Sequence, residues 1–346
     1  MPFGVGVIGI GFGKAVHVPA FRNDSRCEVI AIGASTSDRA REAAQTCGVP
    51  NSYGDWRELI ADPDVQIVSL AVPASLQFEI AREAFRLGKH AFMEKPAAPT
   101  GAQARELVEV AEANNAHGMV DFEFVEAPGW TQLKQALANE ELGRLNFVNV
   151  AWHVCSYAFR KRIFDSWKLR PDQDGGVLNL FGTHTFHYLE WLFGPIARIH
   201  ARLPEAPSLP EGVEALAAMN VEFESGQTGA ISLSNASFMG NGHRLEIYGE
   251  RGSAILANAT KDYIRGATLE IGDIDSDRTR RVECDAGGNT RIDSRIAPVS
   301  RMVDRFITAL EGGPSDFPSI RDGWRVQCLV DLARASNNEG VWLSAS

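Results

Sequence analysis

Short apolar runs alternate with amphipathic segments through the first part of the chain. Runs this short that end in Gly, Pro or polar residues predict buried strands. We expect strands at Val5–Ile10, Val29–Gly33, Ile67–Ala71, His90–Met93 and Gly118–Phe122. Helices are expected at Asp38–Cys47, Trp56–Ala61, Leu76–Leu87 and Thr100–Asn114. Strands that alternate with helices predict an α/β domain with a doubly wound parallel sheet, a Rossmann domain over residues 1–122.

The pattern changes after residue 122. A helix is expected at Pro128–Asn139 and a surface loop or hairpin at Asp273–Asn289. Between Gly-rich turns lie further strand patterns, at Leu145–His153, Ile196–Leu203, Ala215–Phe223, Thr228–Asn235, Leu245–Gly249 and Ala254–Leu256. This order predicts an α+β domain with a mostly antiparallel open sheet over residues 123–346. We expect this domain to bind substrate and to oligomerise, with a C-terminal helix that can pack back on the first domain.

Composition and charge narrow the class of protein. The formal net charge is -10, which argues against binding to nucleic-acid backbones. The five cysteines are scattered and show no metal-ligand spacing, so we expect no metal site and a reducing, cytoplasmic compartment. No apolar run approaches the roughly 20 residues that a membrane helix needs. We therefore expect neither nucleic acid nor a membrane as a partner, and the net charge leaves a small-molecule substrate open.

A glycine-rich turn follows the first predicted strand. In Gly9-Ile10-Gly11-Phe12-Gly13-Lys14 the first two glycines match the dinucleotide fingerprint, which places a pyrophosphate at a helix N-terminus. The third fingerprint position is Lys14, and Gly13 lies one residue early. The alternative is an ordinary strand–turn–helix with no ligand.

The end of the second predicted strand bears on the choice of cofactor. An NAD site usually has an acidic residue there. Here the sequence is Ala34-Ser35-Thr36-Ser37-Asp38-Arg39. Hydroxyl groups and a guanidinium accept a 2′-phosphate, so the sequence favours NADP(H) over NAD(H). Alternatively, Ser37 only caps the helix that follows.

Four short motifs carry a resemblance to a known family. Gly9-x-Gly11, Ala71-Val72-Pro73, Gly88-Lys89-His90 and Glu94-Lys95-Pro96 occur in this order, and together they resemble the glucose–fructose oxidoreductase / inositol dehydrogenase (Gfo/Idh/MocA) family. The resemblance implies a nicotinamide cofactor, with Lys95 close to both nicotinamide and substrate. The Lys95–Pro96 bond can be either cis or trans. The candidate cofactor-binding residues are Gly9, Gly11, Phe12, Gly13, Ser35, Thr36, Arg39, Ala71, Pro73, Gln77, Glu94 and Lys95.

The resemblance continues in the second domain, from Gly175 to His187 and again over Ile320–Leu343. The family's histidine corresponds to His184. The family's aspartate four residues earlier is Leu180 here, and a later aspartate is His187. The family's arginine after the sixth strand matches Val125, so no role transfers to that position.

Hydride transfer from an alcohol needs a base for the hydroxyl proton and positive charge near the oxygen. We assign the base to His184 and the cation to Lys95. The alternative for His184 is a helix-start histidine satisfied by backbone. Further substrate candidates are Asn179, Thr183, His187 and Trp167, the last within a segment of cations and aromatic residues that could equally be solvated surface.

Leu180 leaves three alternatives open: His184 and Lys95 act alone, the substrate has fewer hydroxyls than a sugar, or the fold binds ligands without catalysis. The first hypothesis is a dehydrogenase or reductase for a sugar, cyclitol or related alcohol or carbonyl compound. The second is a non-catalytic dinucleotide- and ligand-binding sensor. A third is a hydrolase or lyase with a tightly held NAD. The resemblance also implies a homodimer or homotetramer.

Overall fold

The computed structural model describes residues 1–205, 209–260, 262–284 and 292–345. The chain divides into two compact units. The first unit comprises Met1–Glu123 and Thr290–Gln327, and the second comprises Phe124–Asn289 and Cys328–Ser346. The sequence analysis places a domain boundary between residues 122 and 123, and this boundary stays a prediction.

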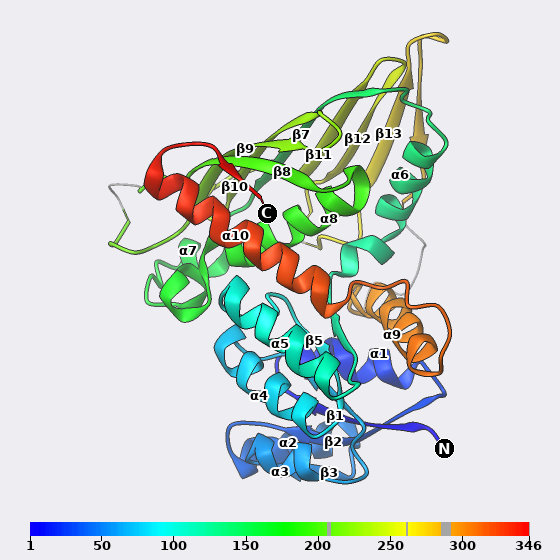
Figure 1. Ribbon diagram of the computed structural model, residues 1–346, viewed down its shortest axis with the longest axis vertical. Helices are drawn as coiled ribbons and strands as arrows, with labels where there is room; N and C mark the ends of the chain where they lie inside the picture. Colours follow the sequence, from blue (N-terminus) through cyan, green and yellow to red (C-terminus); the bar gives the residue numbers. More distant parts are fainter. Residues whose placement is uncertain (206–208, 261, 285–291, 346) are drawn as a thin grey trace. The chain divides into compact units, whose positions relative to one another are not determined.

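The first unit contains a six-stranded parallel sheet in the order β3-β2-β1-β4-β5-β6 (Figure 1). Its strands are β1 (Phe3–Ile8), β2 (Cys27–Gly33), β3 (Asn51–Tyr53), β4 (Ile67–Leu70), β5 (His90–Met93) and β6 (Gly118–Val120). The doubly wound parallel sheet expected from the sequence is confirmed. The short, polar β3 carries too little apolar pattern to be found from the sequence.

The helices of the first unit connect these strands. They are η1 (Gly13–His17), α1 (Val18–Arg22), α2 (Ser37–Cys47), α3 (Trp56–Ala61), α4 (Ala74–Arg86), α5 (Gly101–Ala113) and α9 (Ile296–Leu310). Thr100 caps α5 as expected, with its hydroxyl accepting from the backbone N–H of Gln103. The cap of α2 is Thr36 and not Ser37, because the Thr36 hydroxyl accepts from the Arg39 N–H and Ser37 is already helical.

Strand order explains where a ligand would bind in the first unit. The chain runs outward from β1 to β3 and then returns to the other side of β1 with β4. In open parallel sheets this reversal leaves a crevice at the carboxyl ends of the two central strands. Residues of β4 are buried throughout, as expected of a strand covered on both faces.

The second unit contains a nine-stranded sheet in the order β14-β13-β12-β11-β7-β10-β9-β8-β15 (Figure 1). Its strands are β7 (Leu145–His153), β8 (Ile196–Arg202), β9 (Leu216–Phe223), β10 (Thr228–Ser234), β11 (Gly242–Gly249), β12 (Gly252–Asn258), β13 (Thr268–Asp273), β14 (Arg278–Val282) and β15 (Leu343–Ser344). Neighbours are antiparallel except β7 and β10, which are parallel. The mostly antiparallel sheet is confirmed. The expected loop or hairpin at residues 273–289 contains β14, which pairs with β13, and residues 285–289 lie outside the described part of the chain.

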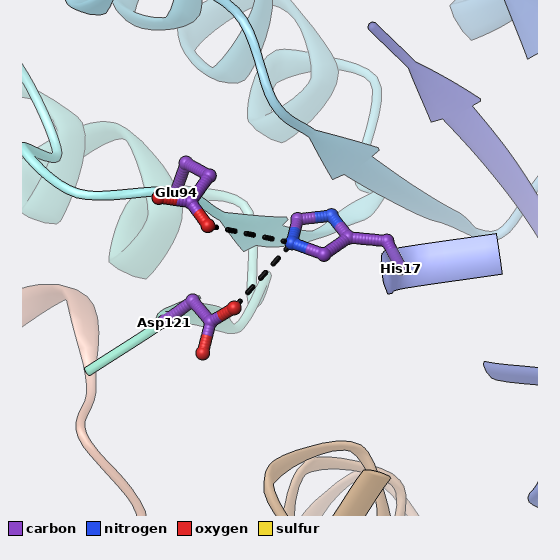
Figure 2. Close-up of side chains that lie close together, drawn as sticks. All are labelled: His17, Glu94 and Asp121. Atoms are coloured by element: carbon purple, nitrogen blue, oxygen red, sulfur yellow. Dashed lines mark ion pairs between the residues drawn. The ribbon is translucent and has the colours of Figure 1, made fainter. Parts of the chain in front are cut away.

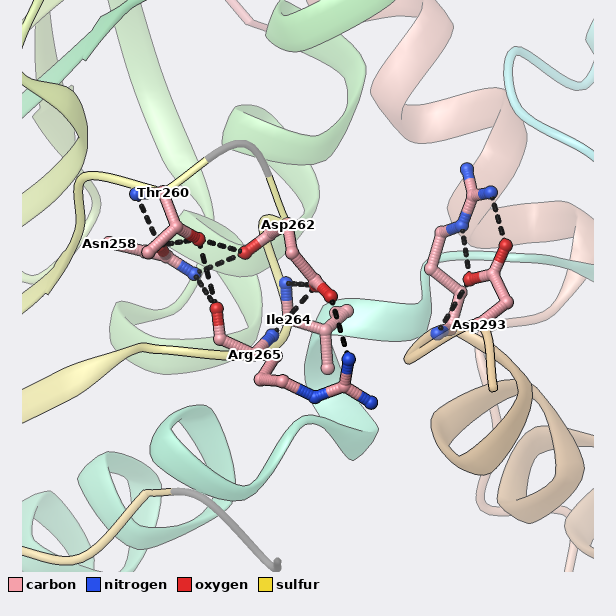
Figure 3. A network of polar contacts seen from close by, with 7 residues as sticks. Asn258, Thr260, Asp262, Ile264, Arg265 and Asp293 are labelled. Carbon is pink, nitrogen blue, oxygen red and sulfur yellow. Dashed lines mark hydrogen bonds and ion pairs between the residues drawn. The ribbon is translucent and has the colours of Figure 1, made fainter. Parts of the chain in front are cut away.

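Helices and a polar turn complete the second unit. Its helices are η2 (Glu123–Glu126), α6 (Pro128–Ala138), α7 (Tyr157–Arg160), η3 (Trp167–Leu169), η4 (Pro171–Gln173), η5 (Leu178–Gly182) and α8 (Thr183–Phe193), and α10 (Ile320–Glu339) begins in the first unit and ends in the second. Between β12 and β13, the buried Asn258 donates to the carbonyls of Asp262 and Arg265, which closes the turn (Figure 3). Within the described ranges, no helix is long and apolar enough to cross a bilayer.

Candidate functional site

The carboxyl ends of four adjacent strands bring candidate residues into one row. Ile8 pairs with Leu70, Leu70 with Met93, and Met93 with Val120. After the strands, Ala71, Glu94 and Asp121 each donate a backbone hydrogen bond to the last residue of the adjacent strand, at 2.7 to 2.9 Å. Gly9 follows Ile8 at the same edge and donates to Gly33 at 3.1 Å. The row consists of Gly9, Ala71, Glu94 and Asp121.

The glycine turn at this edge has the geometry of a dinucleotide site. Gly9 has a φ of +116°, and a Cβ there would lie 2.2 Å from the carbonyl oxygen of Ala71. A Cβ on Gly11 would meet nothing within 4 Å, so the open side of this glycine is available to a ligand. Gly13 packs against β1, where a Cβ would lie 3.1 Å from Val7 Cγ1. The early glycine therefore performs the helix–strand packing that Lys14 cannot perform. These three positions fit a bound pyrophosphate.

Aromatic and cationic side chains adjoin the same turn. The guanidinium of Arg295 lies 4.8 Å from the centre of the Phe12 ring. Arg295 is fixed by two hydrogen bonds to the carboxylate of Asp293, at 2.6 and 2.8 Å. Both Phe12 and Arg295 belong to the first unit, although they come from opposite ends of the chain. No local pattern pointed to Arg295, because its approach depends on α9 packing against α1.

The end of β2 presents hydroxyl and guanidinium groups to solvent. Ser35, Thr36 and Arg39 are exposed. The Nη1 of Arg39 donates to the Ser35 hydroxyl at 2.9 Å. The segment from Gly33 to Arg39 holds one carboxylate, Asp38, which pairs with Arg41. A guanidinium and two hydroxyl groups thus occupy the place where an NAD site usually has a carboxylate.

Hydrogen bonds hold the backbone of Glu94-Lys95-Pro96 before and after the lysine. Its Lys95–Pro96 peptide bond is cis. The buried amide of Gln77, from α4, donates to the carbonyl of Glu94 at 2.5 Å and to the carbonyl of Pro96 at 2.9 Å. Gln77 is expected to contact the cofactor, which stays a prediction; its amide nitrogen binds this backbone. Pro73 precedes α4 and is exposed.

A buried histidine joins the two carboxylates of the row (Figure 2). The Nε2 of His17 lies 3.4 Å from Asp121 Oδ2 and 3.6 Å from Glu94 Oε1. Burial by itself lowers the pKa of His17, but hydrogen bonding and charge from Asp121 and Glu94 outweigh burial and raise it to about 9. The ring is therefore an imidazolium at neutral pH, and its Nδ1 donates to the Ser69 hydroxyl at 2.8 Å.

Asp121 and Glu123 add buried acidic groups after β6. Burial, together with the neighbouring carboxylates, raises the pKa of Glu123 above its usual range. Burial also raises the pKa of Asp121, although His17 and Lys95 act in the opposite direction. The ligand atoms of His17, Glu94 and Asp121 lie within 4.8 Å of one another, a spacing that also suits a metal ion. The imidazolium compensates one of these two carboxylate charges, and Lys95 adds a second positive charge nearby.

Sequence reasoning missed His17, Asp121 and Glu123. Asp121 had a usable signal, because it directly follows Val120 at the end of a predicted strand and so shares an edge with Glu94. His17 had none. It lies on η1, whose wide turn directs it toward β4, and no spacing rule relates position 17 to position 94.

In the second unit, His184 lies on the first turn of α8 and is buried among aromatic rings. Its ring centre is 5.0 Å from that of Phe124 and 6.2 Å from that of Trp152. Trp152 stacks on Phe181 at 4.4 Å and on His243 at 4.1 Å. The ring of His184 is thereby held by packing, in surroundings of low polarity.

The other expected substrate residues differ in what they contact. Asn179 is buried, and its Oδ1 accepts from Arg334 at 3.3 Å. The Thr183 hydroxyl donates to the Asn179 carbonyl, as helix interior hydroxyls do. Burial lowers the pKa of His187 to about 3, so its ring is neutral. Trp167 is exposed, with the Lys168 ammonium 5.8 Å from its ring.

The parallel sheet and its switch-point glycine turn have the geometry of a dinucleotide-binding Rossmann domain. Residues 3–122 match the model of an oxidoreductase family with an NAD-binding Rossmann fold, and residues 130–255 match the GFO/IDH/MocA C-terminal domain. The chain belongs to this family and is a dehydrogenase-type enzyme.

Two curated proteins and one solved structure illustrate the likeness. An uncharacterized oxidoreductase of Synechocystis sp. is 33% identical over 98% of this chain and 95% of its own. Levoglucosan dehydrogenase of Pseudarthrobacter phenanthrenivorans is 24% identical over 98% of this chain and 97% of its own. The structure of a levoglucosan dehydrogenase with NADH and levoglucosan has a TM-score of 0.88 and 23% identity, with both chains covered completely. That structure supports the fold.

Proposed function

We propose that this protein transfers hydride between a nicotinamide dinucleotide and a sugar, cyclitol or related alcohol or carbonyl compound. The observation that carries the proposal is the placement of Lys95. It follows the row residue Glu94, at the same sheet edge as the open glycine turn, and Gln77 fixes the carbonyls on both sides of it. A fixed cation at the dinucleotide edge supplies the charge that an alcohol oxygen needs as it loses its proton.

The proposed division of labour is as follows. The Lys95 ammonium donates a hydrogen bond to the substrate oxygen and stabilises its developing negative charge. His184 takes the hydroxyl proton, and the substrate carbon–oxygen bond becomes a carbonyl as the carbon gives up hydride. A bound nicotinamide supplies the hydride acceptor. In the reverse direction His184 returns the proton to the oxygen of the new alcohol.

NADP(H) is proposed as the favoured cofactor over NAD(H). The support comes from the end of β2, where Ser35, Thr36 and Arg39 are exposed. A 2′-phosphate gains charge-assisted hydrogen bonds from a guanidinium, whereas a carboxylate at this place would repel it. A levoglucosan dehydrogenase with the same fold has been solved with NADH, the other dinucleotide.

A sugar-like substrate is supported by the relative named levoglucosan dehydrogenase. The aromatic surroundings of His184 and the isobutyl group of Leu180 favour substrates with an apolar face, because neither accepts hydrogen bonds from substrate hydroxyls. The proposed substrate class therefore includes cyclic alcohols with fewer hydroxyl groups than a hexose.

The test is to mix the protein with NADP⁺ or NAD⁺ and a panel of sugars, anhydrosugars, cyclitols and diols, and to follow the reduced cofactor by absorbance. We expect turnover with at least one cyclic alcohol, and a loss of about 10²-fold or more in Lys95→Ala and in His184→Ala. The His184→Ala variant should retain dinucleotide binding, measured by quenching of tryptophan fluorescence. Tight binding of dinucleotide and sugar with no turnover in either direction would contradict catalysis and favour a ligand sensor.

A further inference from the structure

Acidic side chains gather near Lys95 in the first unit. Glu94 precedes it at the end of β5, and Asp121 and Glu123 follow β6. The field of Lys95 reaches both Asp121 and Glu123, since it lowers the pKa of each. Glu94 and Asp121 therefore compete with the substrate oxygen for the Lys95 ammonium, whereas the raised pKa of Glu123 favours its neutral form.

His17 is the second cation near these carboxylates, after Lys95. Several contacts fix the orientation of its ring. Ser69 on β4 accepts from Nδ1 at 2.8 Å, which directs Nε2 toward the carboxylates of Glu94 and Asp121. The ring centres of Phe12 and Phe92 lie 5.2 and 5.1 Å from that of His17, in edge-to-face arrangements. Neither His17 nor Asp121 has any exposed side-chain surface. Buried charges of this kind interact strongly, because water does not screen them.

We propose that His17 is a positioning residue for Lys95: its ring holds the neighbouring carboxylates and so leaves the lysine ammonium to the substrate oxygen. The inference rests on the proposed role of Lys95. In the absence of the imidazolium, the two carboxylates that it contacts carry negative charge that Lys95 is left to compensate. The ammonium is then drawn toward them and away from the substrate.

The first experiment compares His17→Gln with the double variant His17→Gln/Asp121→Asn. The single variant keeps a polar group near the ε position but loses the charge, and we expect its kcat to fall at least about tenfold with an unchanged Kd for the dinucleotide. The double variant removes one carboxylate along with the cation. It should recover most of the lost kcat, which a purely structural role of the ring would not allow.

A second readout does not require turnover. The rate at which acetic anhydride modifies Lys95, followed by mass spectrometry of its peptide, reports how tightly the ammonium is held. We expect this rate to fall at least about threefold in His17→Gln and to return in the double variant. If no substrate is turned over but labelling of Lys95 slows in His17→Gln and recovers in the double variant, the proposed function fails. The effect of His17 on Lys95 then stands. If Lys95 is essential for turnover but neither kcat nor labelling changes in His17→Gln, the inference is overturned and the proposed function stands.

A matched pair at Ser69 covers the case in which His17→Gln does not fold. Ser69→Thr keeps the hydroxyl that directs the ring, and Ser69→Val has the same shape without it. The Val variant should show a lower Lys95 labelling rate and a lower kcat than the Thr variant, by about threefold or more. Equal values in two folded variants would overturn the inference.

Discussion

The imidazole Nε2 of His17 lies 3.4 Å from the Oδ2 of Asp121, and neither side chain is exposed to solvent. In the sequence, His17 lies on η1 after β1, and Asp121 directly follows β6. The parallel sheet unites them, because the carboxyl ends of its strands meet at one edge. We expect this pair to make the stability of the first unit depend on pH.

Stability of the first unit should fall as the pH rises. The pKa of His17 in the folded protein, about 9, is raised above its ordinary value of 6.5, so the folded state binds more protons than the unfolded state between these values. The stabilisation is complete below pH 6.5 and is lost as the pH rises through about 9. The raised pKa values of Asp121 and Glu123 act in the same direction.

Urea unfolding at a series of pH values measures this dependence, and an NMR titration of the His17 ring gives its midpoint directly. We expect a midpoint of about 9. A midpoint below the ordinary histidine value would show that burial, and not the carboxylates, controls the ring.

Two glycines of the turn should respond differently to alanine. Gly9→Ala places a Cβ against the Ala71 carbonyl and also strains a residue with positive φ, so it should lower the free energy of unfolding by about 2 kcal/mol or more. Gly11→Ala meets nothing and should fold normally. It should nevertheless weaken dinucleotide binding at least about tenfold, because its methyl group occupies the space of the pyrophosphate. Thermal unfolding and fluorescence titration separate the two effects; normal binding by Gly11→Ala would place the cofactor elsewhere.

Arg39 should discriminate between the two cofactors. Arg39→Gln should weaken NADP(H) binding about tenfold and leave NAD(H) binding within about twofold, because only the 2′-phosphate needs the guanidinium. Arg41→Gln is the matched control, since Arg41 is also exposed on α2 but pairs with Asp38. Competition titrations with both dinucleotides provide the measurement. A wild-type preference of tenfold or so for NAD(H) would reverse the assignment.

The ion pair between Arg334 and Glu214 should stabilise the start of η5, which leads into α8. Glu214 is nearly buried; it accepts from Arg334 at 3.2 Å and, through its other oxygen, from the Leu178 N–H at 2.9 Å. Arg334→Met leaves this carboxylate unpaired and should cost about 3 kcal/mol. The exposed pair of Arg198 and Glu222 serves as control, and Arg198→Met should cost less than about 1 kcal/mol. Denaturant unfolding compares the two; equal losses would mean that Glu214 is well solvated.

Much of the fold could be predicted from local sequence pattern. The bounds of α3, β5 and β7 agree with those expected, and most other elements differ by a few residues at their ends. Strands and helices of this kind bury a continuous or periodic apolar surface, which is visible in the sequence. Elements missed from the sequence include β3, β13 and α9. Strand β3 is short and polar, and the packing of α9 against α1 has no signal in the local sequence.

Some residues of the candidate site could likewise be found from local sequence, and others could not. Sequence alone identified Gly9, Gly11 and the Glu94-Lys95-Pro96 segment, because turn geometry and strand ends depend on neighbouring residues. Only the tertiary structure brought His17 to Asp121, directed Gln77 to the backbone around Lys95, and gave Gly13 the packing role expected at position 14. The reason is physical: burial and charge compensation depend on atoms from distant strands, and their distances are set by sheet register, which no single stretch of sequence encodes.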